Sequence, residues 1–245
     1  VIPEDILQKT LVVFGNEDPE FVMAQLPVRE LAKTLGFQIK TCLNKSSFFE
    51  AIKETGPELL IIDTHGGVDE TTHNSFIMMG DDIITGDDVV NSGIGPQLVF
   101  LSACNTFTTY NTINTIANAF FQIGANAVTT SYMPLHVLPA TVLYIRLLRN
   151  LNKAAHKNIH LNWLSFISHL MRTSYIHAPI GKKENLNLKK ETLDTLSELS
   201  VQSMFFGKRR EVYEKLNNKE FTKSLNYNYE YIIPHYLMYS TLGRA

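Results

Sequence analysis

The sequence predicts an α/β protein with a mostly parallel central sheet and helices on both of its faces. Strand-like and helix-like segments alternate from Thr10 to Leu151, and this βαβα order is typical of parallel sheets. The strand-like segments are continuous apolar runs, as expected for strands that are covered on both faces. With 245 residues, of which 44% are hydrophobic, the chain can form a substantial core, and we expect one domain rather than two small ones.

The expected elements follow one another in order along this part of the chain. Strands are expected at Thr10–Phe14, Phe37–Leu43, Glu58–Thr64, Gln97–Ala103 and Ala125–Ser131. Helices are expected at Glu20–Leu35, Ser46–Glu54, Asn111–Ile123 and Leu135–Leu151. Between the third and fourth strands, the pattern predicts a hairpin that turns at Gly80-Asp81-Asp82 and leads into a helix with Thr85 and Asp88 as its capping box.

The pattern changes beyond about residue 152. Helical segments cover roughly 158–175 and 188–216, and the polar, Lys-rich stretch at 181–192 joins them. We therefore expect a helical, Lys-rich insertion at about 152–225. The segment Tyr229–Leu242 is aromatic and β-branched enough to return to the sheet as a strand, and Pro234 favours an edge position.

Composition excludes several classes of protein. The formal net charge of -2 gives no global attraction to nucleic acid or to an anionic membrane. Two cysteines without CxxC spacing indicate a reducing, cytosolic setting, and no run is apolar enough for a signal peptide or a membrane span. The segment "FGNEDPE" at 14–20 lacks the glycine pattern of a dinucleotide or phosphate loop, so we expect no cofactor.

Two strand ends carry the candidate chemistry. "IIDTHGG" at 61–67 ends a buried strand in His65-Gly66-Gly67, and "LVFLSACNT" at 98–106 delivers Cys104 at the end of the next strand. Functional groups of open parallel sheets lie outside the carboxyl ends of the strands. If these two strands are neighbours, His65 and Cys104 emerge at the same edge of the sheet.

A cysteine beside a histidine at such an edge is suited to nucleophilic catalysis. A free thiol has a pKa near 8.5, so it needs a base or a positive environment to act as a thiolate. Gly66 lacks a Cβ, and its amide could approach a substrate carbonyl and form an oxyanion hole with the Cys104 amide. We expect Gly67 to let the chain turn sharply away, and Cys42, which lies inside a strand, to be a core residue.

Simpler interpretations compete with this one. A single cysteine or histidine at a strand end is more often a packed core residue, so it is the pair, in this order, that favours catalysis. The four aspartates Asp81, Asp82, Asp87 and Asp88 could hold a divalent cation, but turn and helix-cap chemistry explains them, and we expect no metal.

The quoted motifs resemble those of the CHAT domain, a caspase-like cysteine peptidase module. The segments "SFIMMGDDIITGDDV", "AFFQIGANAVTTSYM" and the closing "IIPHYLMYSTLG" extend the resemblance over nearly the whole chain, except for about 152–225. The resemblance implies a caspase-like three-layer sandwich and a catalytic dyad that corresponds to His65 and Cys104. It also implies an N-terminal sensor such as tetratricopeptide repeats. Because the sequence starts at Val1 without a methionine, we expect that sensor region to be missing from this chain.

The chain departs from the family pattern around the expected specificity pocket. Family members usually carry a tryptophan and an acidic residue after the fifth strand, where this chain has Tyr132 and Met133. In the related metacaspases an acidic residue two positions before the nucleophile selects basic side chains, and here that position is Ser102. We expect Asp63, Ser102, Tyr132 and Met133 to form the pocket. A neutral or apolar residue should then be accepted at least as well as arginine, and a strict preference for Arg or Lys would implicate Asp63.

These observations predict a cysteine endopeptidase that cleaves a protein substrate without a cofactor. Its expected partners are the substrate and the sensor region or a regulatory partner that switches it on, in a setting such as bacterial defence or a CRISPR-associated system. Movement is expected in the loop at 105–110 and in the Lys-rich stretch at 181–192. The alternative is a caspase-like binding or scaffold domain that keeps the fold without catalysis, and labelling of Cys104 by an electrophilic peptide probe would separate the two.

Overall fold

The computed structural model describes residues 2–107, 115–135, 137–157, 159–174 and 239–243, together with single residues and pairs between 191 and 218. A six-stranded sheet forms its centre, with the strand order β2-β1-β3-β7-β8-β9. The strands are β1 (Thr10–Phe14), β2 (Gln38–Thr41), β3 (Leu59–Asp63), β7 (Leu98–Ser102), β8 (Ala127–Ser131) and β9 (Tyr239–Gly243). The first five pair in parallel, and β9 is antiparallel at the edge beside β8. The predicted α/β class and the mostly parallel sheet are therefore confirmed.

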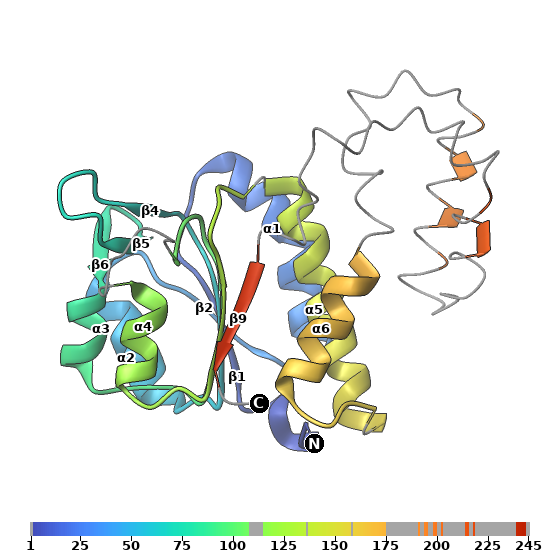
Figure 1. The fold of residues 1–245 in the computed structure, drawn as a ribbon, viewed down its shortest axis with the longest axis horizontal. Coiled ribbons are helices and arrows are strands. Elements are labelled where there is room, and N and C mark those ends of the chain that lie inside the picture. The colour runs from blue at the N-terminus through green and yellow to red at the C-terminus, as the bar shows by residue number, and fades with distance from the viewer. Residues whose placement is uncertain are drawn as a thin grey trace.

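Helices cover both faces of this sheet and make three layers (Figure 1). One layer contains α1 (Pro19–Thr34), α5 (Val137–Lys157) and α6 (Trp163–Ser174). The opposite layer contains α2 (Lys45–Thr55), α3 (Gly86–Ser92) and α4 (Ile116–Gln122). A short 3-10 helix, η1 (Glu4–Ile6), precedes β1. Each layer encloses its own apolar cluster against the sheet, because successive side chains of a strand point to opposite faces.

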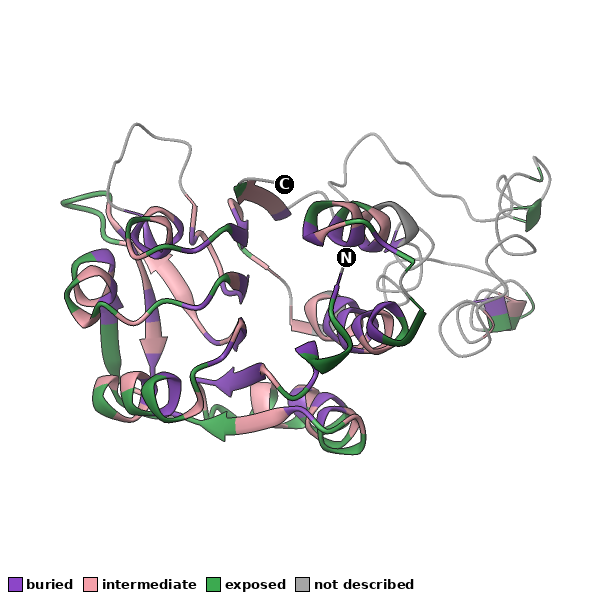
Figure 2. Cartoon of the chain, turned by 90° about the horizontal axis from the view of Figure 1, so that it is seen from below, coloured by how far each residue is buried: buried purple, intermediate pink, exposed green. Residues whose placement is uncertain are grey.

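Alternation along the strands divides the core in two. In β1, Val12 and Phe14 pack under α1 and α5, whereas Leu11 and Val13 pack under α2. All of these side chains are fully buried, as expected for parallel strands covered on both faces. Figure 2 shows the buried residues gathered on the strands and on the sides of the helices that face them. Cys42 belongs to the cluster under α2, so its predicted core position is confirmed.

A second, three-stranded antiparallel sheet follows β3. It contains β4 (Gly66–Val68), β5 (Ser75–Met79) and β6 (Asp82–Thr85), in that order. The predicted hairpin corresponds to β5 and β6, and the capping box of Thr85 and Asp88 begins α3 as expected. The sequence analysis missed β4, which is only three residues long and contains two glycines.

The insertion expected at about 152–225 stays a prediction, because most of its residues lie outside the described ones. Residues 152–157 continue α5, and α6 packs its apolar side into the same cluster as α1 and α5, with Trp163, Phe166 and Leu170 buried. The helical layer therefore includes residues up to Ser174. The Lys-rich stretch at 181–192, except for Glu191, and Pro234 lie outside the described residues, so those predictions stay untested.

Among the helices of the described residues, none combines the length and the apolar character that a membrane-spanning helix requires.

Candidate active site

The ends of β3 and β7 lie side by side. The two strands pair in parallel from Leu59 opposite Leu98 to Asp63 opposite Ser102, and one further backbone hydrogen bond, from Thr64 N to Ser102 O at 3.3 Å, continues the pairing. The predicted neighbourhood of these strands is confirmed. His65 and Cys104 each follow two residues beyond the paired Asp63 and Ser102, so both residues come from the same edge of the sheet.

The chain passes from β3 into the small sheet at Thr64 and His65. The Thr64 hydroxyl donates to the Met78 carbonyl, and the Met78 N–H donates to the carbonyl of His65 at 2.9 Å. The Thr64 side chain and the His65 carbonyl are therefore both bonded to Met78 of β5. The imidazole packs on the ring of Phe21 from α1, with ring centroids 4.5 Å apart.

Gly66 lies directly against the backbone of Cys104. A Cβ at position 66 would come within 2.5 Å of the Cys104 carbonyl oxygen and 3.2 Å of its nitrogen, so a side chain could not be accommodated without moving one of the two segments. The ladder between β4 and β5 also orients the Gly66 amide. His65 and Asp69 make the hydrogen bonds to β5, and bonded positions alternate along an antiparallel strand. The N–H of Gly66 therefore points away from β5.

Gly67 has a different role from the one predicted. It lies inside β4, opposite Phe76, and a Cβ there would come within 2.7 Å of the Phe76 ring. The chain does not turn at this residue. Glycine leaves room for the aromatic ring.

Buried hydroxyl groups fix the segment that carries Cys104. The Ser131 hydroxyl donates to the Ala103 carbonyl at 2.6 Å, and the Phe107 N–H donates to the Ser131 carbonyl at 2.9 Å. The hydroxyl of Thr106 also donates to Ala103 O and lies 2.6 Å from the Thr130 hydroxyl.

The residue after the cysteine is Asn105, which adopts a left-handed φ of 50°, a conformation that asparagine tolerates better than most residues. Residues 105–107 are anchored by polar bonds to β8, and Phe107 packs against the apolar cluster under α2. The movement expected in the loop at 105–110 stays a prediction. Residues 108–110 lie outside the described residues.

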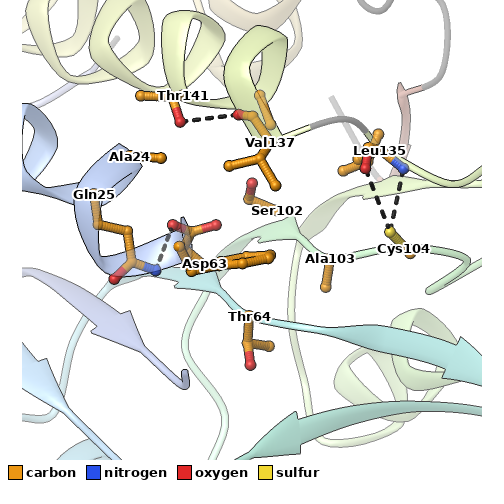
Figure 3. Close-up of a pocket in the computed structure, with 12 residues that line it drawn as sticks. Ala24, Gln25, Asp63, Thr64, Ser102, Ala103, Cys104, Leu135, Val137 and Thr141 are labelled. Carbon is orange, nitrogen blue, oxygen red and sulfur yellow. Dashed lines mark hydrogen bonds between the residues drawn. The ribbon is translucent and has the colours of Figure 1, made fainter. Parts of the chain in front are cut away.

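The Cys104 thiol is partly exposed and meets the backbone of the segment after β8. The N–H of Leu135 donates to Cys104 Sγ over 3.2 Å (Figure 3). Leu135 lies two positions before Val137, the first residue of α5. The segment from β8 to α5 therefore lies over the sulfur.

A pocket of about 30 Å³ opens beside this sulfur. Its lining comes from α1, from the ends of β3 and β7, and from the start of α5: Phe21, Ala24, Gln25, Asp63, Thr64, Ser102, Ala103, Cys104, Leu135, Val137, Ala140 and Thr141. In Figure 3, Asp63 and Ser102 point toward α1 and α5, whereas Thr64 points to the other side of the sheet. The volume is sufficient for one or two water-sized groups, so the pocket is narrow in this conformation.

Asp63 is the acidic group of the pocket. Burial raises the pKa of its carboxyl to about 6, against the opposing effect of hydrogen bonds from Gln25 and Ser102 and of the charge of Arg29. Gln25 Nε2 donates to Asp63 Oδ2 at 3.0 Å, and Arg29 donates to Gln25 Oε1 at 3.2 Å. Arg29 thus orients the Gln25 amide so that its NH₂ group faces the carboxyl.

The pocket contains some of the predicted residues and not others. Asp63, Ser102 and Cys104 line it, whereas Tyr132 and Met133 do not. The outer wall comes from Leu135 and Val137 instead, and the expectation that Tyr132 and Met133 bind the substrate stays a prediction. His65 and Gly66 lie outside the lining, and Gly66 packs on the Cys104 backbone. Their catalytic roles stay predictions.

The contribution of α1 to the pocket was not expected from the sequence. Phe21 and Gln25 lie one turn apart on this helix, and both line the pocket. Gln25 is 2% exposed, and a buried glutamine on the inner face of an amphipathic helix is the signal that could have identified it.

Two of the four aspartates considered as cation ligands have other partners. Asp88 caps α3 and pairs with Lys45 at 2.9 Å, and Asp82 accepts the backbone N–H of Lys45. Within the described ranges, no group of three or more His, Cys, Asp or Glu side chains could hold a metal ion.

Two solved structures of cysteine proteinases are similar to this chain. A crystal structure of the Arg-specific cysteine proteinase gingipain R is 13% identical and has a TM-score of 0.48, with 70% of this chain and 44% of that chain covered. The complex of the RgpB pro- and mature domains from Porphyromonas gingivalis is 14% identical and has a TM-score of 0.44, with 85% and 46% covered. This chain thus spans less than half the length of either structure. Among curated protein sequences, none matches it.

The family model that matches is the CHAT domain, over residues 16–161, which is more than half of the chain. The matched region contains β3, β7 and β8, the site at their ends and most of the two helical layers. The chain therefore belongs to the CHAT domain family and has the caspase-like fold of this family, with a mostly parallel sheet between two helical layers.

Proposed function

We propose that this protein is a cysteine endopeptidase with Cys104 as nucleophile and His65 as its acid–base partner. The observation that carries the proposal is the packing of Gly66 on the backbone of Cys104, where an added Cβ would come within 2.5 Å of the carbonyl. This close approach joins the histidine-bearing segment to the cysteine-bearing segment at the edge of a parallel sheet, where active sites of such sheets lie.

The chemistry follows from this arrangement. The Cys104 thiolate attacks the carbonyl carbon of the scissile peptide bond, and the carbonyl oxygen becomes an oxyanion. The N–H groups of Gly66 and Cys104 donate to that oxygen. His65 then protonates the leaving amine, the C–N bond breaks, and a thioester remains on Cys104. Water, deprotonated by His65, attacks the thioester, releases the carboxylate product and returns the thiol.

The orientation of the Gly66 amide supports the oxyanion role. Its N–H points away from β5, on the side of β4 that is not occupied by the ladder. Each donor of an oxyanion hole contributes on the order of a hundredfold or more in rate. Neither donor depends on a side chain, so the proposed oxyanion hole relies on the backbone alone.

We further propose that a sensor region or a regulatory partner activates the site. The Leu135 N–H donates a hydrogen bond to the Cys104 sulfur, and the pocket beside the sulfur has a volume of about 30 Å³. A peptide substrate would have to displace the segment from β8 to α5 from the thiol. A shift of about 1 Å in such a segment changes rates on the order of a hundredfold, so a partner that biases its position would control cleavage. We propose that the protein acts in the cytoplasm, as a protease of bacterial defence or of a CRISPR-associated system.

The same contact also fits the alternative of a silent scaffold domain. An electrophilic peptide probe distinguishes the two, because an acyloxymethyl ketone reacts with an activated thiolate and not with an inert thiol. We expect labelling of Cys104 that is lost in His65→Ala. Cys42, which is buried and whose pKa is raised by burial to about 11, serves as the internal control thiol. Equal labelling of Cys42 and Cys104 in the folded protein would favour the scaffold.

A further inference from the structure

The pocket beside Cys104 contains a single formally charged lining residue. Of the twelve side chains that line it, Asp63 alone is a carboxyl, and no lysine or arginine contributes. The pocket opens next to the proposed nucleophile, so it receives the side chain of the residue whose carbonyl is attacked. Asp63 therefore faces the substrate residue that precedes the scissile bond.

The charge of Asp63 is not neutralised by a direct ion pair. Its hydrogen-bond partners are neutral donors, Gln25 Nε2 at 3.0 Å and the Ser102 hydroxyl. Among the ion pairs of the residues that the structure describes, none includes Asp63. A buried carboxylate without a cationic partner is costly, and a positively charged group that enters the pocket would relieve this cost.

The nearest cation is held away from the pocket. Arg29 donates to Gln25 Oε1 at 3.2 Å and to Thr41, and its guanidinium lies over the Phe14 ring at 4.0 Å. These contacts fix Arg29 on the far side of Gln25. The arginine thus orients the amide that donates to Asp63 without filling the pocket.

The walls of the pocket are suited to a long side chain with a polar end. Phe21, Ala24, Val137 and Ala140 provide apolar surface, and Asp63 provides an acceptor beyond it. Lysine and arginine bury their methylene stems along apolar surface and place the charge at the tip.

We propose that Asp63 selects a cationic residue, arginine or lysine, at the substrate position that precedes the scissile bond. This inference rests on the proposed endopeptidase function and names its substrate class. It reverses the expectation drawn from Ser102, because the acidic group comes from the end of β3 instead of the position two residues before the nucleophile. Entry of the side chain requires displacement of Leu135 and Val137, since the present volume of about 30 Å³ holds only one or two water-sized groups.

The preference depends on pH through Asp63. The charged or titratable groups that face Asp63 are Arg29 from α1, Tyr144 from α5 and Tyr239 from β9. Burial raises the pKa of both tyrosines, so they stay neutral, and Arg29 stays charged. Asp63 is then the group whose charge changes near pH 6, and its affinity for a cation is lost as it becomes protonated below that pH.

Binding tests the inference without requiring catalysis. In Cys104→Ala, we would measure the affinity of a fluorescent peptide that ends in arginine and of the same peptide ending in citrulline, a neutral isostere. We expect the arginine peptide to bind at least about tenfold more tightly at pH 8, and this ratio to approach one at pH 5. The added Asp63→Asn should bring the ratio within about twofold at pH 8, whereas the added Asp87→Asn, which removes an exposed carboxyl of α3 outside the pocket lining, should preserve it.

Cleavage of matched substrates separates this inference from the proposed function. The two substrates differ only in arginine or citrulline before the scissile bond. In the ratio of their kcat/KM values, the effects of ionisations that both reactions share, including those of His65 and Cys104, cancel. Equal affinity of the two peptides, absence of binding by both, or a ratio unchanged by Asp63→Asn would overturn the role of Asp63. Cleavage of both peptides at equal rates would overturn it while leaving the endopeptidase intact. Selective binding without cleavage, both by this chain alone and with its activating partner, would overturn the endopeptidase and leave the role of Asp63 intact.

Discussion

The ends of β3 and β7 occupy equivalent positions in the sheet, but different parts of the protein hold them. Beyond β7, the backbone around Cys104 is bonded to β8 of the same sheet through Ser131 and Thr106. Beyond β3, the backbone of His65 is bonded to Met78 of the small second sheet, and its ring packs on α1. The two proposed catalytic side chains therefore depend on different supports. These supports are joined by the contact of Gly66 with Cys104 and by the hydrogen bond from the Ser75 hydroxyl of β5 to Thr106 O at 3.2 Å.

This difference suggests how the site can be regulated. Rigid polar bonds fix the cysteine segment to the central sheet, so a movement that controls activity should occur elsewhere. We expect that movement in the segment after β8, where Leu135 meets the sulfur, because Ile77, Met79 and Ile84 of the small sheet are fully buried in the same cluster as the central strands. Substitutions on each side should consequently separate loss of chemistry from loss of stability.

Replacement of the sulfur should have the largest effect on activity. We expect Cys104→Ala to lower kcat/KM by at least about a thousandfold, because the other cysteine of the sequence, Cys42, is buried under α2 and does not line the pocket. The free energy of unfolding, measured by thermal denaturation, should change by less than about 1 kcal/mol, because Cys104 is partly exposed and the smaller side chain leaves little cavity.

His65→Ala is the companion variant on the β3 side. This variant should lose activity to a similar extent. Its small remaining activity should rise at high pH, because the thiolate then forms without a base. Cleavage by Cys104→Ala at the parental rate would remove Cys104 from the mechanism.

A methyl group on Gly66 tests the contact that joins the two sides. Gly66→Ala would place a Cβ about 2.5 Å from the Cys104 carbonyl oxygen, which belongs to the backbone and cannot rotate away. We expect kcat/KM to fall on the order of a hundredfold, as for a displacement of about 1 Å, and stability to fall by about 1 to 3 kcal/mol.

Gly67→Ala is the matched control in the same strand, because its Cβ would meet the side chain of Phe76, which can shift. It should lower stability and leave most of the activity. A Gly66→Ala protein as active as the parent would show that the contact does not position the dyad.

The neighbourhood of the two strand ends could be predicted from sequence because it depends on local patterns. Continuous apolar runs identified β3 and β7, and their order and spacing were sufficient to expect His65 and Cys104 at one edge. The pocket could not be predicted to the same extent. Gln25 precedes Asp63 by 38 positions, and only tertiary packing of α1 decides which of its polar side chains faces the sheet.

The supports of the site were harder still to predict. Thr106 and Ser131 are common loop and strand residues, and their hydrogen bonds become visible only when β7 and β8 are aligned. Gly67 suggested a turn because glycine is frequent in turns, whereas here its lack of a side chain accommodates Phe76. Leu135 contacts the sulfur through its backbone N–H, a group that carries no sequence signal.

Asp63, at the end of β3, should make the stability of the protein depend on pH. Its pKa in the folded protein is about 6, above the ordinary value of 3.8. Between these values the folded state binds more protons than the unfolded state, so stability falls as pH rises from about 4 to 6. We expect Asp63→Asn, which lacks this contribution, to gain about 2 kcal/mol relative to the parent between pH 4 and pH 7.5.

Chemical denaturation at several pH values measures this difference. Ser102→Ala, at the paired position of β7, keeps the carboxyl but removes a hydrogen bond that lowers its pKa, so its fall in stability should extend to a higher pH than in the parent. Parallel stability curves for Asp63→Asn and the parent would mean that Asp63 titrates alike in the folded and unfolded states.

Ser131→Ala should have the smallest effect and tests the support on the β7 side. Its hydroxyl donates to Ala103 O at 2.6 Å in a fully buried position, and loss of one such bond costs about 1 to 2 kcal/mol of stability. Activity should fall by less than about tenfold, because the Phe107 N–H still bonds to Ser131 O and Thr106 still bonds to Ala103 O. The comparison to make is with Ser92→Ala, which removes a hydroxyl bonded to Val89 O on α3, away from the site. If Ser131→Ala lost stability as Ser92→Ala does but activity fell a thousandfold, the β7 end would be as sensitive as the β3 end, and the cysteine segment would have to be counted among the parts that can move.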